Sequence, residues 1–118
     1  MSPMESTNVF LQGVRTIAGA GLDAPAPADP PLTHTVPGGS VCQALYFRGG
    51  NSTDELVLAV LVKDGQPMRY FPIGAKADNH VPLRVVEDVL GDSVLELHLA
   101  APAGVTGEVV VDLGMVEY

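Results

Sequence analysis

The residues whose types could do chemistry gather in one segment of the sequence, residues 68–80. This segment combines two basic side chains, an aromatic ring, an amide and an imidazole, namely Arg69, Tyr70, Lys76, Asn79 and His80. Because binding residues lie on loops more often than on strands, we predict a ligand-contact site here. The alternative is an ordinary long connection whose charges face water.

A second candidate is an acid–base pair built on His98. In the alternating stretch 94–100, His98 shares a polar face with Glu96, and antiparallel pairing with the last strand would set it opposite Glu108 or diagonal to Asp112. A histidine beside a carboxylate can act as a general base. The same pattern also fits a solvated face with one cross-strand ion pair.

Metal-binding and nucleophile signatures are missing from the sequence. The three imidazoles, His34, His80 and His98, include no His-x-His pair that would place two ligands on one face of a strand. Cys42 is the only cysteine, so neither an intrachain disulfide nor a cysteine cluster can form. Within a strand it is most simply a small buried hydrophobe. We therefore predict no metal site, no cofactor and no catalytic residue.

The elements that must position these groups are short apolar, β-branched runs separated by Gly, Pro, Asn and Asp. The runs are residues 41–47, 55–63, 68–73, 80–86, 94–100 and 108–117, and residues 8–17 could hold one more strand. This spacing is typical of a sandwich or barrel. We predict an all-β, single-domain antiparallel β-sandwich of about seven strands, with either immunoglobulin-like or jelly-roll topology. The best helix candidate is a single turn at residues 85–90.

The clearest connection is the pair Asp64-Gly65, which supplies the positive φ angles of a tight hairpin. It predicts that residues 55–63 pair with residues 68–73. The other glycine-rich stretches are expected to be turns, at residues 37–39, 48–52 and 101–107, the last joining the final two strands.

Residues 1–39 differ in character from the sandwich core expected over residues 40–118. After the possible strand, residues 18–39 are rich in Pro, Gly and Ala, which excludes a helix and any central strand. Two alternatives remain for this segment. It is either an ordered loop that caps the sandwich, or a stiff extended arm that packs on a neighbouring subunit.

The stretch 56–62 does not alternate between apolar and polar residues. A strand that is apolar on both faces is covered on both, and a two-layer sandwich covers only one. Either the Pro-rich segment or another subunit must lie over the outer face. We predict Val57, Ala59 and Leu61 as outward residues of a subunit interface.

Charge and hydropathy exclude several partners. Fourteen acidic residues against six scattered basic ones give a formal net charge of −8, so we expect no nucleic-acid partner and no anionic membrane surface. The longest apolar run is too short to cross a bilayer, and residues 1–8 lack the basic and apolar regions of a secretory signal. We expect a soluble, cytoplasmic protein.

Three functions follow in order of preference. The first is a non-enzymatic protein that self-associates or serves as a structural or accessory subunit of a larger assembly, with itself or another protein subunit as partner. The second is a small-ligand or carbohydrate-binding module that uses residues 69–80 with Tyr46 or Tyr70 as a stacking ring. The third is a small enzyme that uses His98 and a carboxylate.

Overall fold

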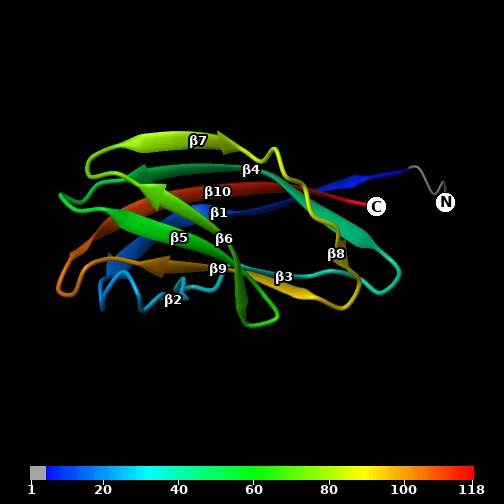
Figure 1. Ribbon diagram of the computed structural model, residues 1–118, viewed down its shortest axis with the longest axis horizontal. Coiled ribbons are helices and arrows are strands. Elements are labelled where there is room, and N and C mark those ends of the chain that lie inside the picture. The colour runs from blue at the N-terminus through cyan, green and yellow to red at the C-terminus, as the bar shows by residue number, and fades with distance from the viewer. Residues whose placement is uncertain (1–4) are drawn as a thin grey trace.

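The computed structural model describes residues 5–118, which form two antiparallel β-sheets packed face to face (Figure 1). Sheet A contains β1 (Thr7–Ala18), β10 (Thr106–Glu117), β4 (Val41–Asn51) and β7 (Asp78–Pro82), with the short β8 (Val89–Leu90) paired to the start of β4. Sheet B contains β2 (Ala26–Pro27), β3 (Thr33–Thr35), β9 (Val94–Ala100), β5 (Val57–Lys63) and β6 (Gln66–Ile73). Residues 1–4 lie outside the described residues. They belong to the stretch 1–8, for which the sequence predicts no secretory signal.

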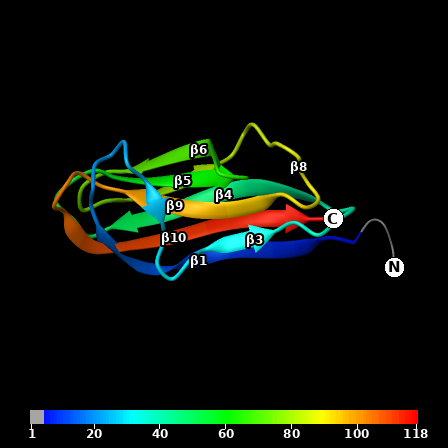
Figure 2. The ribbon, with the colours of Figure 1, turned by 90° about the horizontal axis from the view of Figure 1, so that it is seen from below.

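The order of the strands identifies the topology as a jelly roll. Strands β2 and β3 act as one position in the sheet, and so do β7 and β8, which leaves eight positions along the chain. They pair from the outside inward: β1 with β10, β2 and β3 with β9, β4 with β7 and β8, and β5 with β6. Strands β1 and β10, at the two ends of the chain, therefore run side by side (Figure 2). This order decides between the two topologies that the sequence left open.

The core lies between the sheets and follows from alternation along the strands. In β9 the buried residues are Leu95, Leu97 and Leu99, and in β10 they are Val109, Val111, Leu113 and Met115. Phe47 of sheet A and Phe71 of sheet B stack at the centre with ring centroids 4.4 Å apart. Burying each of these rings stabilises the fold by roughly 1.5–3 kcal/mol. The alternation therefore ties the two sheets into one core.

The predicted β-sandwich and its hairpin at Asp64-Gly65 are confirmed. Residues 64 and 65 have φ angles of 50° and 79°, and β5 pairs with β6 as expected. Within residues 5–118 there are ten strands and no helix, so the expected count of seven and the helical turn at residues 85–90 are wrong. The extra strands are two- and three-residue segments, which are too short to show a period of two.

Two expectations about β4 and β9 are also wrong. Residues 48–51 continue β4 instead of turning, because Gly49 and Gly50 keep extended backbone inside the sheet. Strand β9 pairs with β5 in sheet B, whereas β10 belongs to sheet A. Residues 101–105 therefore cross between the layers, residues 106 and 107 already belong to β10, and His98 does not lie opposite Glu108 or diagonal to Asp112.

The faces of β5 are reversed relative to the prediction. Val57, Ala59 and Leu61 are fully buried in the core between the sheets. The outer face carries Leu58, Val60 and Val62. The chain itself already covers Val60, because its cross-strand partners Tyr70 and His98 stand on either side of it. In an unbroken apolar run, residue type does not distinguish the inward face of a strand from the outward one. The sequence therefore could not decide which residues of β5 point into the core.

The Pro- and Gly-rich segment packs on its own chain. Its strands β2 and β3 pair with the edge of β9, and Ala28, Leu32 and Val36 enter the core. Proline is tolerated there because an edge strand needs fewer ladder hydrogen bonds. The core is therefore built from residues on both sides of position 40.

Candidate functional site

The outer face of sheet A presents three rows of side chains that cross four strands. In the order β1, β10, β4 and β7 the rows are Phe10, Gly114, Tyr46 and Pro82; then Gln12, Asp112, Arg48 and His80; then Val14, Val110, Gly50 and Asp78. Polar, charged and aromatic groups from distant parts of the sequence thus meet on one surface.

A hollow opens where Gly50 leaves this surface without a side chain. It has a volume of about 860 Å³ and is lined by Arg48, Gly49, Gly50, Asp78, Asn79, His80, Val110 and Asp112. A second hollow of about 720 Å³ shares Gly50, Asp78 and Val110 with it and extends to Val14, Ser52, Lys76 and Glu108. We call the two together the Gly50 trough. The volume of each hollow, taken by itself, falls within the range of ligand sites in proteins.

The two neighbouring glycines of β4 differ in whether the packing around them requires glycine. A Cβ at Gly49 would point inward and stand 2.6 Å from Ile73 Cδ1 and 2.7 Å from Phe47 Cε2, so the packed core requires glycine there. A Cβ at Gly50 would meet only Val110, at an ordinary 3.7 Å. Packing therefore does not require glycine at position 50, and its effect is to keep the trough open.

At one end of the trough, Tyr46 of β4 contacts residues of the two neighbouring strands, β10 and β7. Its ring lies against Gly114 of β10, where any Cβ would overlap it. Its hydroxyl donates to Asp112 Oδ1 at 3.3 Å, and His80 stands edge-on to the ring at 5.9 Å between centroids. Desolvation, followed by the Asp112 charge, raises the pKa of Tyr46. The hydroxyl therefore stays protonated as a donor, and Tyr46 contacts two residues, Asp112 and His80, that line the first hollow.

At the other end a buried asparagine organises the connections. Asn51 Nδ2 donates to the carbonyls of Glu55, Ile73 and Gly74, and its Oδ1 accepts from the backbone N–H and hydroxyl of Thr53. These bonds hold the β4–β5 and β6–β7 connections against each other. Lys76 lies in the β6–β7 connection, and its ammonium donates to the Ser52 carbonyl at 2.8 Å. The ammonium therefore borders this end of the trough.

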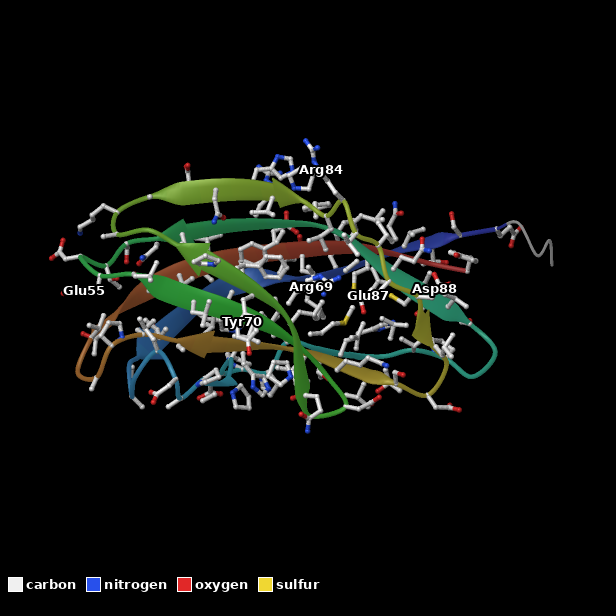
Figure 3. All side chains as sticks on the ribbon, in the orientation of Figure 1. Glu55, Arg69, Tyr70, Arg84, Glu87 and Asp88 are labelled. Atoms are coloured by element: carbon white, nitrogen blue, oxygen red, sulfur yellow. The ribbon has the colours of Figure 1, made fainter. Side chains whose placement is uncertain are left out.

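The five residues predicted from segment 68–80 do not form one site. Lys76, Asn79 and His80 line the trough, and the Asn79 amide also donates to the Pro72 carbonyl at 2.8 Å. Arg69 and Tyr70 belong to sheet B. Figure 3 shows Arg69 beside Glu87, with which it forms an ion pair, and Tyr70 lies 59% exposed on the outer face of sheet B. The segment divides because the chain changes sheets between β6 and β7.

Sequence reasoning missed Arg48, Asp78 and Asp112 as site residues. Alternation along β4, with Tyr46 and Arg48 on the side opposite Phe47, is a signal that could have placed two of the groups. The strand order that brings Asp112 and His80 beside them has no local signature.

His98 lies on the outer face of sheet B, on the opposite side of the sandwich from Glu108 and Asp112. Its nearest carboxylate is Glu96, with 3.8 Å between Nε2 and Oε2. The Nε2 atom is buried and makes no hydrogen bond to the described residues. A proton relay needs a hydrogen-bonded partner in reach of solvent, and this arrangement does not supply one.

A second polar cluster lies between the sheets. His34 Nε2 of β3 and Glu117 Oε1 of β10 are 2.7 Å apart, and Cys42 Sγ of β4 completes a group whose ligand atoms lie within 4.8 Å of one another. Cys42 Sγ also contacts Met115 Sδ at 3.8 Å. Burial, followed by the Glu117 charge, raises the pKa of the Cys42 thiol to about 11. The thiol is therefore protonated at neutral pH.

The described residues contain no helix long and apolar enough to span a membrane.

Comparison with known proteins supports the fold alone. No protein-family model matches the chain, and no curated protein matches it by sequence. Among solved structures, the CBM36-1 domain of a multidomain xylanase from the hindgut metagenome of Trinervitermes trinervoides superposes with a TM-score of 0.58 at 14% identity, covering 93% of this chain and 96% of that domain. A chain of infectious bursal disease virus, Gx strain, superposes with a TM-score of 0.55 at 13% identity, covering 96% of this chain and 31% of the viral one. The chain is thus similar in fold to both and spans less than a third of the viral chain.

Proposed function

We propose that this protein is a non-enzymatic binding module that holds a neutral oligosaccharide in the Gly50 trough. The observation that carries the proposal is the Tyr46 ring, which lies against Gly114 and contacts His80 and Asp112, two residues that line the trough. Most residues that line the trough are polar, with Val14 and Val110 among the few apolar ones, which suits a ligand held by hydrogen bonds.

The chemistry of these groups suits a sugar. The face of a tyrosine ring packs against the C–H groups of a pyranose, which are apolar and weakly positive. Planar carboxylate and guanidinium groups form bidentate hydrogen bonds, which match pairs of neighbouring hydroxyls. Asp112 and Arg48 lie in the row next to Tyr46 and Asp78 lies in the row beyond, and we assign them this role.

The balance of charge favours a neutral ligand. Basic groups in the trough are Arg48, His80 and Lys76, and acidic groups are Asp78, Glu108 and Asp112. Phosphate or a polyanion needs concentrated positive charge, and here each base has an acid close by. The fold neighbour from a xylanase is a carbohydrate-binding module, which adds a precedent for such a sandwich in this role.

Isothermal titration calorimetry against xylohexaose, cellohexaose and mannohexaose tests the proposal. We expect at least one of the three to bind, and both Tyr46→Ala and Gly50→Val to weaken binding at least about tenfold, equivalent to ~1.4 kcal/mol. Gly50→Val adds a side chain to the trough, and its Cβ would meet only Val110, at an ordinary 3.7 Å. Tyr70→Ala, on the opposite outer face, is the control and should bind as the wild type. Binding that survives both trough substitutions, or no binding to any of the three sugars, would overturn the proposal.

A second candidate function is self-association through sheet A. Residues 5–118 include eleven exposed large hydrophobic residues, and six of these are carried by this sheet and its ends: Phe10, Val14, Leu45, Leu90, Val110 and Tyr118. Apolar residues gathered on one face favour a covering partner. The sequence predicts an interface on β5 of sheet B. The proposed interface lies instead on sheet A, with a second copy of the chain as partner.

Sedimentation velocity over a range of concentrations tests self-association. Phe10→Asp combined with Leu90→Asp should shift a dimer to monomer and leave sugar binding intact, because neither residue lines the Gly50 trough. Tyr70→Asp on sheet B is the matched control. A wild-type chain that stays monomeric at every concentration would contradict this second function.

A further inference from the structure

Four side chains with metal-binding atoms meet where the two sheets close at one end of the sandwich. His34 belongs to β3 of sheet B, Cys42 lies at the start of β4, and Met115 and Glu117 lie at the end of β10. Cys42 and Met115 are buried, and the side chains of His34 and Glu117 are 21% and 13% exposed. The cluster is thus enclosed on its sulfur side and open to solvent at its imidazole and carboxylate.

We propose that His34, Cys42 and Glu117 form a site for Zn²⁺, with Met115 as a sulfur neighbour. Imidazole, thiolate and carboxylate are the three protein ligand types of zinc. Once the thiol has released its proton, thiolate and carboxylate together carry two negative charges. These neutralise a divalent ion, which a partly buried position requires.

The three ligand atoms already lie near one another. Those of His34, Cys42 and Glu117 are all within 4.8 Å of one another, and around a tetrahedral ion they would stand about 3.3–3.6 Å apart. Met115 Sδ, 3.8 Å from Cys42 Sγ, is a neighbour of the site and not a fourth ligand. The His34–Glu117 pair, at 2.7 Å, must open by roughly 0.6 Å to reach the nitrogen–oxygen edge of such a site. His34 and Glu117 reach solvent, so they can make this adjustment without repacking the core.

The site would act as a clamp between the layers. Strand β3 has only three residues and pairs with the edge of β9, yet His34 reaches across to the last strand of sheet A. An ion bound by His34, Cys42 and Glu117 would join β3 to both β4 and β10. The inference is independent of the Gly50 trough, which shares none of these residues.

Titration of the metal-free protein with Co²⁺, a spectroscopic substitute for Zn²⁺, tests the site. We expect a sulfur-to-cobalt charge-transfer band that saturates at one equivalent and disappears when Zn²⁺ is added. His34→Gln keeps a hydrogen-bonding side chain toward Glu117 but removes the imidazole, and should weaken binding at least about tenfold. Cys42→Ser should abolish the charge-transfer band.

Two matched controls separate this site from adventitious binding. His80→Gln and His98→Gln remove the other imidazoles of the chain and should leave the band and its affinity unchanged. Circular dichroism of every variant establishes that it is folded, and the surface position of His34 makes His34→Gln the variant to rely on. No band for folded wild-type protein, or a band of equal affinity in His34→Gln, would overturn the proposal.

Discussion

The ring of Tyr46 on β4 rests on Gly114 of β10, and this contact exists only because position 114 has no side chain. The same row continues from Gly114 to Phe10 on one side and from Tyr46 to Pro82 on the other. The pairing register shifts between Gly114 and Met115, so the contact sits at an irregularity of the sheet. A local bulge and a missing Cβ together let the tyrosine ring lie against the backbone of β10.

The first prediction concerns this contact. Gly114→Ala should displace the Tyr46 ring and cost about 1–3 kcal/mol of unfolding free energy, because the added methyl overlaps the ring. The matched change Gly50→Ala, on the same face, should stay within about 0.5 kcal/mol of wild type. Urea unfolding and the ring-proton NMR shifts of Tyr46 measure both effects. Equal stabilities for the two variants would show that the ring does not depend on Gly114.

The second prediction concerns Asn51. Asn51→Ala leaves the carbonyls of Glu55, Ile73 and Gly74 without their amide donor, and each buried group that stays unpaired costs about 1–3 kcal/mol. We expect a total loss of roughly 2–4 kcal/mol in urea unfolding. Asn79→Ala removes one exposed bond to Pro72 and should cost less than about 1 kcal/mol. A cost for Asn51→Ala as small as that of the control would contradict the role of Asn51 as the organiser of these connections.

What the sequence could predict depended on local signals. The Asp64-Gly65 turn, the leucine alternation of β9 and the valine alternation of β10 each carry their own period or backbone requirement, and all three describe the structure. Gly49-Gly50 was misread because glycine in a strand interior and glycine in a turn look alike without the partner strands. The core contact that requires Gly49 comes from Ile73, more than twenty residues away.

The candidate site was predictable in part for the same reason. His80 and Lys76 stood out by residue type, but Tyr46, Arg48 and Asp112 reach them only through the order β10, β4, β7. The metal cluster has still less local signal, since His34 and Glu117 are 83 residues apart in the chain. Non-local pairing of this kind is decided by how the jelly roll closes and not by any one segment.

The third prediction tests the faces of β5. Val57 is fully buried between the sheets, so Val57→Asp would bury an unpaired charge and should cost more than about 4 kcal/mol, enough to unfold the chain. Leu58 points to the outer face and is only partly covered, so Leu58→Asp should cost about 1 kcal/mol. Circular dichroism and urea unfolding of the two variants check the assignment. A folded Val57→Asp beside an unfolded Leu58→Asp would mean that the two faces are exchanged.

The fourth prediction is a pH dependence that originates at Cys42. Burial and the Glu117 charge raise the pKa of its thiol from an ordinary value of 9.0 to about 11 in the folded chain. Between these two values the folded state binds more protons than the unfolded state, so the free energy of unfolding should fall as the pH rises through this window. Stability that the neutral thiol contributes is therefore complete below about pH 9 and is lost toward about pH 11.

Urea unfolding of the metal-free protein across this alkaline window measures the effect. Tyr46 also has a raised pKa and lowers stability in the same direction, so the wild type must be compared with Cys42→Val, which keeps the volume of the side chain but cannot ionise. We expect the variant to lose stability less steeply than the wild type. Parallel curves would show that the pKa of the Cys42 thiol is the same in the folded and the unfolded chain, so that neither burial nor the Glu117 charge raises it.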